Sequence, residues 1–169
     1  MRRLLYLFCQ WTWGLPQTLI GAVFYLYYRQ KGCLHFRYQG AYAVVWTKRA
    51  GSMSMGCFLF LYPGWTPDNR TLLEHEYGHT IQSLLCGPLY LLAIGLPSVL
   101  WAGVPAFRRR RQTRHVSYYA VYPEKQATAL GQRFAKAALP GPEGAALPVR
   151  SEPSETAETN EHKQGREEA

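Results

Sequence analysis

Acidic residues are scarce in most of this 169-residue chain. Before residue 141 only four are present: Asp68, Glu74, Glu76 and Glu124. Residues 151–169, in contrast, carry six Glu against two basic residues, a net charge of −4. Since the whole chain has a net charge of +8, residues 1–150 carry +12. The basic body therefore offers very few carboxylates for catalysis or for binding a metal ion.

The sequence also lacks the cysteine patterns of zinc ribbons and small disulfide-rich domains. Cys9, Cys33, Cys57 and Cys86 form no C-x-x-C pair, so we expect free thiols in a reducing compartment. Motifs of nucleic-acid-binding domains are missing as well, and we expect no nucleic acid as a partner. The run "RRRR" at 108–111 directly follows an apolar stretch, a position that favours contact with anionic lipid headgroups.

No long apolar run is free of interruptions. Leu4 to Tyr28 is uncharged but is broken by "QWTWGLPQ", and the uncharged stretch from Leu84 to Phe107 contains three Gly and three Pro. A secretory signal peptide fits poorly, because "LLYLF" is short and no cleavage site follows. The pattern favours two bent, membrane-inserting stretches over straight spans, although buried helices of a soluble protein are an alternative.

Basic residues flank both stretches. Two Lys or Arg precede the first stretch, six lie between the two, and eleven follow the second. Because all three flanks favour the cytoplasmic side, we expect a monotopic protein on the cytoplasmic face of the inner membrane, in contact with its lipid surface.

Short strands and a helix are predicted between the apolar stretches. "CLHFRYQGAYAVVWTK" and "SMSMGCFLFLYPG" are rich in Val and aromatic residues, with turn signals at Gln39-Gly40 and at 49–51, and predict small antiparallel strands. Thr71 and Glu74 have the spacing of a capping box, which predicts a helix from Thr71 to Cys86 that Gly87 ends.

The predicted helix carries the motif H-E-x-x-H. His75 and His79 lie one turn apart on one helix face, where both imidazoles could bind one zinc ion. Glu76 is offset from that face and suits a general base that takes a proton from a zinc-bound water. Gly78 occupies a position where a side chain would obstruct close packing on the helix.

A catalytic zinc needs a third protein ligand. Downstream of the motif and before the tail, the donors are Cys86, His115 and Glu124. Cys86 lies two turns beyond His79 and is out of reach, while His115 belongs to the basic run. Pro123 and the residues after it predict a second helix that presents Glu124, and we favour this residue over His115.

The motifs resemble those of a known family. "HEYGH" followed by "EKQATALG" is similar to the gluzincin pattern H-E-x-x-H, then E-x-x-A-D-x-x-G, of integral-membrane metalloendopeptidases such as the prenyl-protein protease and the bacterial heat-shock membrane protease. The blocks "LPQTLIG", "HEYGHTIQS", "GPLYL", "GLPS" and a late "Y-x-E-K" resemble short bacterial membrane-associated proteins of unassigned activity, and together they cover most of residues 13–131.

The resemblance implies roles for single residues. It assigns His75, His79 and Glu124 as zinc ligands and Glu76 as the general base. Thr128 stands where the larger family has an Asp, so the carboxylate that would orient a ligating His is missing. Three nearby tyrosines could supply a phenol to an oxyanion, and Tyr118 and Tyr122 are the candidates, with Tyr119 between them.

We therefore expect an α+β protein in three parts: an apolar membrane-associated segment (1–31), a zincin-like catalytic domain (32–136) with an apolar hairpin at 84–107, and a disordered acidic tail (137–169). The expected function is that of a zinc-dependent metallopeptidase, a hydrolase acting on peptide or protein substrates near a membrane. A second hypothesis is a zinc-stabilised, catalytically inactive membrane adaptor. A third is hydrolysis of a lipid-linked or amide substrate by the same chemistry.

Overall fold

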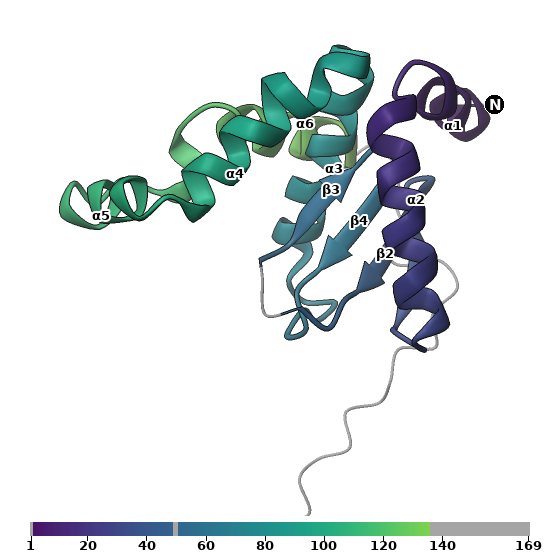
Figure 1. Ribbon diagram of the computed structural model, residues 1–169, viewed down its shortest axis with the longest axis horizontal. Helices are drawn as coiled ribbons and strands as arrows, with labels where there is room; N and C mark the ends of the chain where they lie inside the picture. The colour runs from purple at the N-terminus through teal and green to yellow at the C-terminus, as the bar shows by residue number, and fades with distance from the viewer. Residues whose placement is uncertain (1, 49–50, 136–169) are drawn as a thin grey trace, which may run out of the picture.

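Helices surround a small sheet in the part of the chain that the computed structural model describes, residues 2–48 and 51–135 (Figure 1). The helices are α1 (Arg2–Thr12), α2 (Leu15–Gln30), α3 (Arg70–Cys86), α4 (Leu96–Gly103), α5 (Pro105–Thr113) and α6 (Glu124–Ala135). The strands are β1 (His35–Tyr38), β2 (Ala41–Val45), β3 (Met53–Met55) and β4 (Phe58–Leu61). The α+β class is confirmed, and the predicted tail, 137–169, lies outside the described residues.

The sheet is mixed, with the strand order β1-β2-β4-β3. β1 and β2 are antiparallel, and the turn between them lies at Gln39 and Gly40, as the sequence predicts. Both turn residues have positive φ. β3 and β4 are also antiparallel. The prediction of antiparallel strands is wrong for β2 and β4, which are parallel, because the chain leaves β2 for the sheet edge at β3 and turns at Gly56 to place β4 between them.

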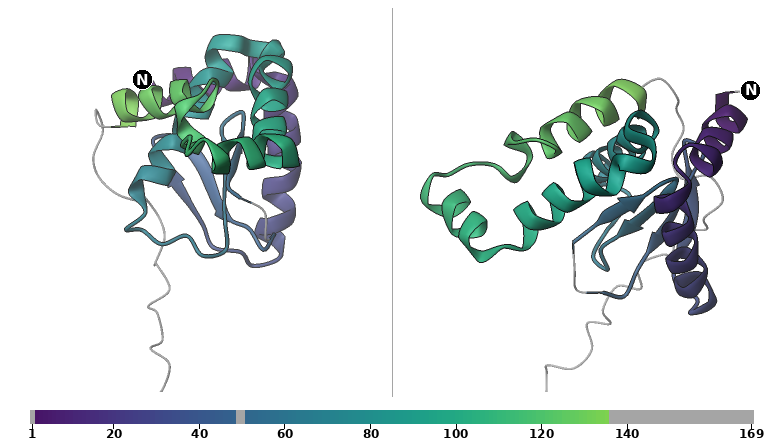
Figure 2. Two further views of the ribbon diagram at one scale, coloured as in Figure 1. Left: turned by 90° about the vertical axis from the view of Figure 1, so that its left-hand side faces the viewer. Right: turned by 45° about the horizontal axis from the view of Figure 1, so that its top comes forward.

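Helices cover both faces of the sheet (Figures 1 and 2). On one face α2 packs against β4, with Tyr25 contacting the ring of Phe58 at 5.3 Å between centroids. On the other face the Tyr77 ring of α3 meets Tyr38 of β1 edge-to-face at 5.7 Å. Burial on both faces accounts for the continuous apolar sequence "FLFL" of β4, all of which is buried.

Buried polar side chains join the first apolar stretch to α3. Gln10 donates to the Thr80 carbonyl at 2.9 Å and accepts from the Ser83 hydroxyl at 2.9 Å. Gln17 donates to the Ser83 hydroxyl at 2.8 Å and to the Gly87 carbonyl at 2.9 Å. The glutamines that interrupt the apolar stretch thus hold α1 and α2 against the helix that carries H-E-x-x-H.

The helix α3 begins earlier than the capping box predicts. Asn69 is its N-cap and accepts from the Leu72 amide at 3.3 Å, whereas Glu74 pairs with Arg70 at 3.1 Å. Asn is as good an N-cap as Thr, and the pairing of Glu74 with Arg70 removes the second half of the box. Gly87 ends the helix as predicted, with φ at 54°.

The second apolar stretch leaves the body as an arm, formed by the π-helical turn Leu91–Gly95, α4 and α5 (Figure 1). Neither α4 nor α5 has a buried residue. None of the described helices is by itself long and apolar enough to cross a bilayer; residues 91–103 and 105–113 reach that length and hydropathy only as a pair, bent by 69°.

Candidate metal centre

The site lies between α3 and α6, which pack unusually closely. A Cβ atom on Gly78 would come within 1.9 Å of the Ala127 carbonyl oxygen of α6. On the opposite helix, a Cβ on Gly131 would come within 2.0 Å of the Glu74 carbonyl oxygen of α3. Each helix therefore presents a glycine to the backbone of the other, and this close approach brings Glu124 to the two histidines.

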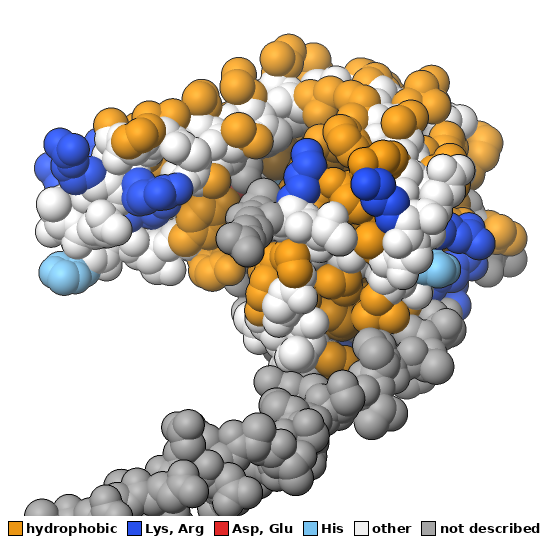
Figure 3. Space-filling view, turned by 60° about the horizontal axis from the view of Figure 1, so that its bottom comes forward, with side chains coloured by type: hydrophobic (Ala, Val, Ile, Leu, Met, Phe, Trp, Pro, Cys, Tyr) orange, Lys and Arg blue, Asp and Glu red, His pale blue; other side chains and the backbone are white. Residues whose placement is uncertain are grey.

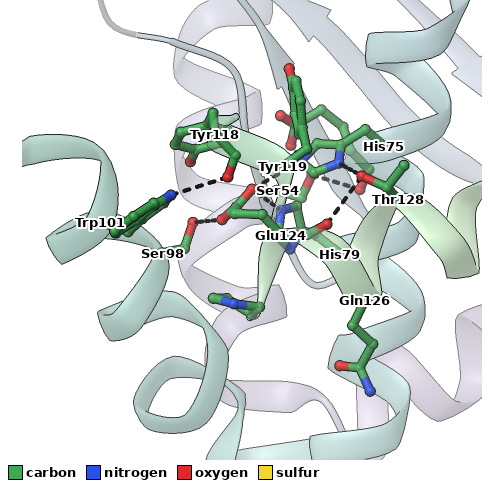
Figure 4. Close-up of polar contacts among 12 residues, drawn as sticks. Ser54, His75, His79, Ser98, Trp101, Tyr118, Tyr119, Glu124, Gln126 and Thr128 are labelled. Carbon is green, nitrogen blue, oxygen red and sulfur yellow. Dashed lines mark hydrogen bonds and ion pairs between the residues drawn. The ribbon is translucent and has the colours of Figure 1, made fainter. Parts of the chain in front are cut away.

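Three side chains converge between the helices (Figure 4). His75 Nε2 lies 3.0 Å from Glu124 Oε2, and His79 Nε2 lies 3.5 Å from the same oxygen. The three are buried, with 4%, 6% and 1% of their surface exposed, and their donor atoms all lie within 4.8 Å of one another. The structure thus brings together the three residues that the sequence nominates as ligands.

Neutral acceptors orient both imidazoles. Thr128 donates its only hydroxyl proton to the Glu124 backbone carbonyl at 3.1 Å, so it accepts from His75 Nδ1 at 2.9 Å. Gln82 donates its amide to Gln126 at 2.9 Å and to the Pro123 carbonyl at 3.0 Å, so its oxygen accepts from His79 Nδ1 at 2.7 Å. With both Nδ1 atoms protonated, each Nε2 can turn a lone pair toward the centre.

Thr128 therefore takes over the orienting contact that we expected to be lost with the Asp. A hydroxyl carries no charge, so it fixes the ring without adding a carboxylate to the site.

Glu124 is oriented from the arm. The hydroxyl of Ser98 on α4 donates to Glu124 Oε1, which leaves Oε2 for the histidines. Burial by itself would raise the pKa of Glu124, but hydrogen bonds from His75 and His79 outweigh it and hold the pKa well below its ordinary value. The carboxyl is therefore a ready anionic ligand.

The pKa of His79 shifts in the opposite direction to that of Glu124. Burial would lower its pKa, yet the hydrogen bond to Glu124 and the charge of Glu76 raise it. A centre without a cation therefore favours a proton between the imidazoles and the carboxylate, and a bound cation would replace that proton.

Glu76 is buried beside the three ligands, with 4% of its surface exposed. Its Oε2 accepts from the Ser54 hydroxyl of β3 at 2.7 Å. Burial raises its pKa, and the nearby imidazoles and Ser54 oppose that shift only in part. A raised pKa makes the carboxylate a stronger base, which suits a group that takes up a proton and later releases it.

The three tyrosines take different positions. The Tyr119 ring meets His75 edge-on, with centroids 4.8 Å apart, and 44% of its surface is exposed. Tyr118 lies near Glu124 and Ser98, and burial, together with the charge of Glu124, raises its pKa. The Tyr122 hydroxyl instead donates to the Ala93 carbonyl at 2.9 Å. The structure thus places Tyr118 and Tyr119, but not the Tyr122 hydroxyl, beside the ligands.

The other candidate ligands lie outside the cluster. His115 is exposed just beyond α5, and Cys86 is the last residue of α3. Among residues 2–48 and 51–135, His75, His79 and Glu124 are the group whose donor atoms converge in this way.

Three contributors to the site escaped the sequence reasoning: Ser54, Gln82 and Ser98. Gln82 follows His79 by three residues, a spacing that could have pointed to it, because side chains at i and i+3 share a helix face. Ser54 and Ser98 come from elements far from the motif in sequence, and we find no signal that could have identified them.

Comparison with protein-family models, with curated proteins and with solved structures gives no match for the chain.

Proposed function

We propose that this chain is a zinc-dependent metallopeptidase that hydrolyses peptide bonds near a membrane surface. The observation that carries the proposal is the convergence of His75 Nε2, His79 Nε2 and the Glu124 carboxylate beside the buried carboxyl of Glu76. Two imidazoles and one carboxylate are the protein ligands of one of the common types of catalytic zinc site.

The spacing of the donors supports zinc. Ligands about 2.1 Å from a tetrahedral zinc lie about 3.4 Å from one another, and Glu124 Oε2 lies 3.0 Å and 3.5 Å from the two Nε2 atoms. All three donor atoms lie within 4.8 Å of one another, so side-chain movements could bring them to these distances. Zinc bound there would act as a Lewis acid and lower the pKa of a water molecule toward neutrality.

The chain's own groups would then move the proton. Glu76, held by Ser54, accepts a proton from the attacking water and delivers it to the leaving amine. Thr128 and Gln82 keep the imidazoles in the ligating tautomer, and Ser98 keeps Glu124 turned toward them. Tyr119 is exposed next to His75 and, with Tyr118, could donate to an oxyanion.

Exposed apolar side chains support a place at a membrane. Leu4, Phe8 and Val23 on α1 and α2 are 73%, 65% and 69% exposed. On the arm, Leu92 and Val99 are 68% and 65% exposed. Apolar surface of this extent marks an interaction site, and helices that lie in a bilayer interface bury such faces in lipid.

Zinc content tests the proposed site. Elemental analysis of detergent-purified protein should give about one zinc per chain, as a three-ligand site requires. The ion should be lost from His79→Ala and Glu124→Ala and kept by His115→Ala, which removes an exposed imidazole. Equal zinc in all four proteins would contradict the assignment of ligands.

Turnover tests the mechanism separately. Glu76→Gln should keep its zinc while hydrolysis of a pool of quenched fluorescent peptides falls by about 10²- to 10⁴-fold, the usual contribution of a general base. Full activity in Glu76→Gln would rule out the mechanism.

The burial of all three ligands also favours a second candidate, a zinc-stabilised membrane adaptor without catalytic activity, because structural zinc sites are closed. A soluble hydroxamate, which binds zinc only at an open position, separates the two. Tight binding of the hydroxamate would support the peptidase, whereas bound zinc that ignores it would support the adaptor.

A further inference from the structure

The arm ends in a cluster of arginines. The helix α5 and the residue after it carry five of the 19 basic residues of the chain, which are Arg108, Arg109, Arg110, Arg111 and Arg114. All are exposed except Arg111, which is partly buried, with its guanidinium over the Trp101 ring. Figure 3 shows basic side chains at the end of the arm and no acidic side chain on the visible face of the described residues. Positive charges gathered in this way attract anionic groups.

The surroundings of the arginine cluster supply no counter-charge. Residues 77–123, which include the whole arm, contain no Asp or Glu. Among the acidic residues that the structure describes, Glu76 and Glu124 are buried at the metal centre, and Glu74 forms an ion pair within α3. Asp68 precedes α3 in the sequence. None of the ion pairs in the described part of the chain involves the cluster.

The other acidic residues of the chain all lie after α6. Most of them fall within residues 151–169, which we call the acidic segment and which has a net charge of −4. Four glutamates form a row at every third position: Glu152, Glu155, Glu158 and Glu161. In an extended chain this spacing places a carboxylate about every 10 Å. Two neighbouring glutamates can therefore contact a helix of the length of α5, about 14 Å, at the same time.

The chain that leads to the acidic segment is long enough to reach the cluster. The Arg111 guanidinium lies 5.4 Å from the centre of the Tyr118 ring. From Tyr118 the chain covers at most about 20 Å to Glu124, and α6 adds about 17 Å, so Ala135 lies within about 50 Å of Arg111. The chain from Ala135 to Glu152 spans up to about 56 Å when extended.

We propose that the acidic segment docks on the arginine cluster of its own chain and shields the cluster from other anions. A single exposed ion pair contributes little to stability, so the contact depends on several pairs at once, which the five arginines and the row of glutamates supply. Because both partners belong to one chain, the local concentration of the segment at α5 is on the order of 1 mM. The inference is independent of the metal centre, since none of the proposed zinc ligands takes part.

Zero-length crosslinking of the full chain tests the contact. A carbodiimide joins a carboxylate to an amine that touches it. Arginine offers no such amine, so Arg109→Lys and Arg110→Lys keep the charge and introduce the reactive group. Arg133→Lys in the same protein is the matched control, because position 133 is also exposed and lies near the end of α6, closer to the acidic segment along the chain. Mass spectrometry measures the links to each position.

We expect the links to be strongest at the cluster and to depend on salt. At about 50 mM salt, where the Debye length is about 14 Å, the acidic segment should give about tenfold more links to positions 109 and 110 than to position 133. At about 1 M salt, where the Debye length is about 3 Å, this excess should disappear. Equal or more frequent links to position 133 at low salt would overturn the proposal, because a segment without a preferred site meets the nearer amine more often.

A mixture of isotopically labelled and unlabelled chains separates contacts within one chain from contacts between chains. We expect the links to join segments of the same isotope. Frequent links between a labelled and an unlabelled chain would overturn the proposal and assign the cluster to the acidic segment of a second copy.

Binding to an anionic surface tests the shielding. Replacing the four glutamates of the row with glutamine should strengthen cosedimentation with vesicles of phosphatidylcholine and phosphatidylglycerol by about tenfold. The gain should fall below about twofold in a chain that also carries Arg108→Gln, Arg109→Gln and Arg110→Gln, because the two sets of changes remove the same contact. The same change in both backgrounds, including none, would overturn the shielding. Zinc content should be equal in all variants, so failure here is distinguishable from failure of the metal site.

Discussion

The α3–α6 pair and the α4–α5 arm differ in whether their side chains are buried and bonded within the chain. Between α3 and α6 the ligands are buried, and each imidazole Nδ1 has a protein partner. Along α4 and α5 no residue is buried, and apolar and cationic side chains face outward. The helix pair is complete within the chain, whereas the arm has the composition of a surface that a partner covers.

The largest expected effect comes from opening the helix pair. Gly78→Ala places a methyl group 1.9 Å from the Ala127 carbonyl oxygen and should lower the free energy of unfolding by about 3 kcal/mol, as severe overpacking does. Gly103→Ala on the arm, where nothing lies within 4 Å of the new Cβ, is the matched control and should change it by less than about 0.5 kcal/mol. Denaturant unfolding in detergent measures both, and similar losses would remove the contrast between the two regions.

A smaller effect is expected from loosening one imidazole. Thr128→Val removes the acceptor for His75 Nδ1 and should weaken zinc binding by about 10- to 100-fold. Thr113→Val removes a hydroxyl that bonds only within the arm and should leave zinc affinity unchanged. Competition with a chromogenic chelator gives both constants, and unchanged affinity in Thr128→Val would show that the ring is held by packing alone.

The contact between the two regions should give a further, more modest effect. Ser98→Ala removes the arm's hydrogen bond to Glu124 Oε1 and should weaken zinc binding by about tenfold, at the lower end for groups that orient a ligand. Ser98→Thr keeps a hydroxyl at this position and should restore most of the affinity. A loss in both variants would mean that the site is sensitive to the shape of the arm and not to this hydrogen bond.

The smallest effect is expected on the outer face of the arm. Val99→Ala shortens a side chain that is 65% exposed and should change the free energy of unfolding in water by less than about 0.5 kcal/mol. Thermal unfolding without lipid would check this, and a loss near that of a core truncation, about 1 kcal/mol or more per side chain, would mean that the arm is packed against something.

The sequence predicted the site better than its surroundings. The i, i+4 spacing places His75 and His79 on one helix face whatever the tertiary structure, and the scarcity of acids left Glu124 as a carboxylate donor downstream. Glu124 was therefore found by elimination. Ser98 and Ser54 could not be found in this way. Each serine has its role only through a contact with a residue far away in the sequence, and local sequence patterns do not indicate such contacts.

Strand pairing failed for a similar reason. Short apolar segments with turn signals indicate strands but not which strand a segment joins, and β4 entered the sheet beside β2 in parallel. As a result β4 is an interior strand, and β3 forms the edge of the sheet next to it. Gln10 and Gln17 interrupt the first apolar stretch in the sequence, and only the structure shows that they hydrogen-bond to α3.

Those glutamine contacts have a consequence for how the protein is made. Gln10 and its partner Thr80 are separated by 70 residues. During synthesis α1 and α2 therefore leave the ribosome well before α3, which supplies the hydrogen-bond partners of Gln10 and Gln17. Until α3 is made, both helices lack these protein partners and expose their apolar faces, and a bilayer surface is a place where amphipathic helices can bury such faces. A shortened chain that starts after residue 31 would lack the hydrogen bonds that Gln10 and Gln17 make to Ser83 and to the Gly87 carbonyl at the end of α3. Removing the amino-terminal helices to obtain a more soluble protein would therefore disturb the helix that carries the histidines.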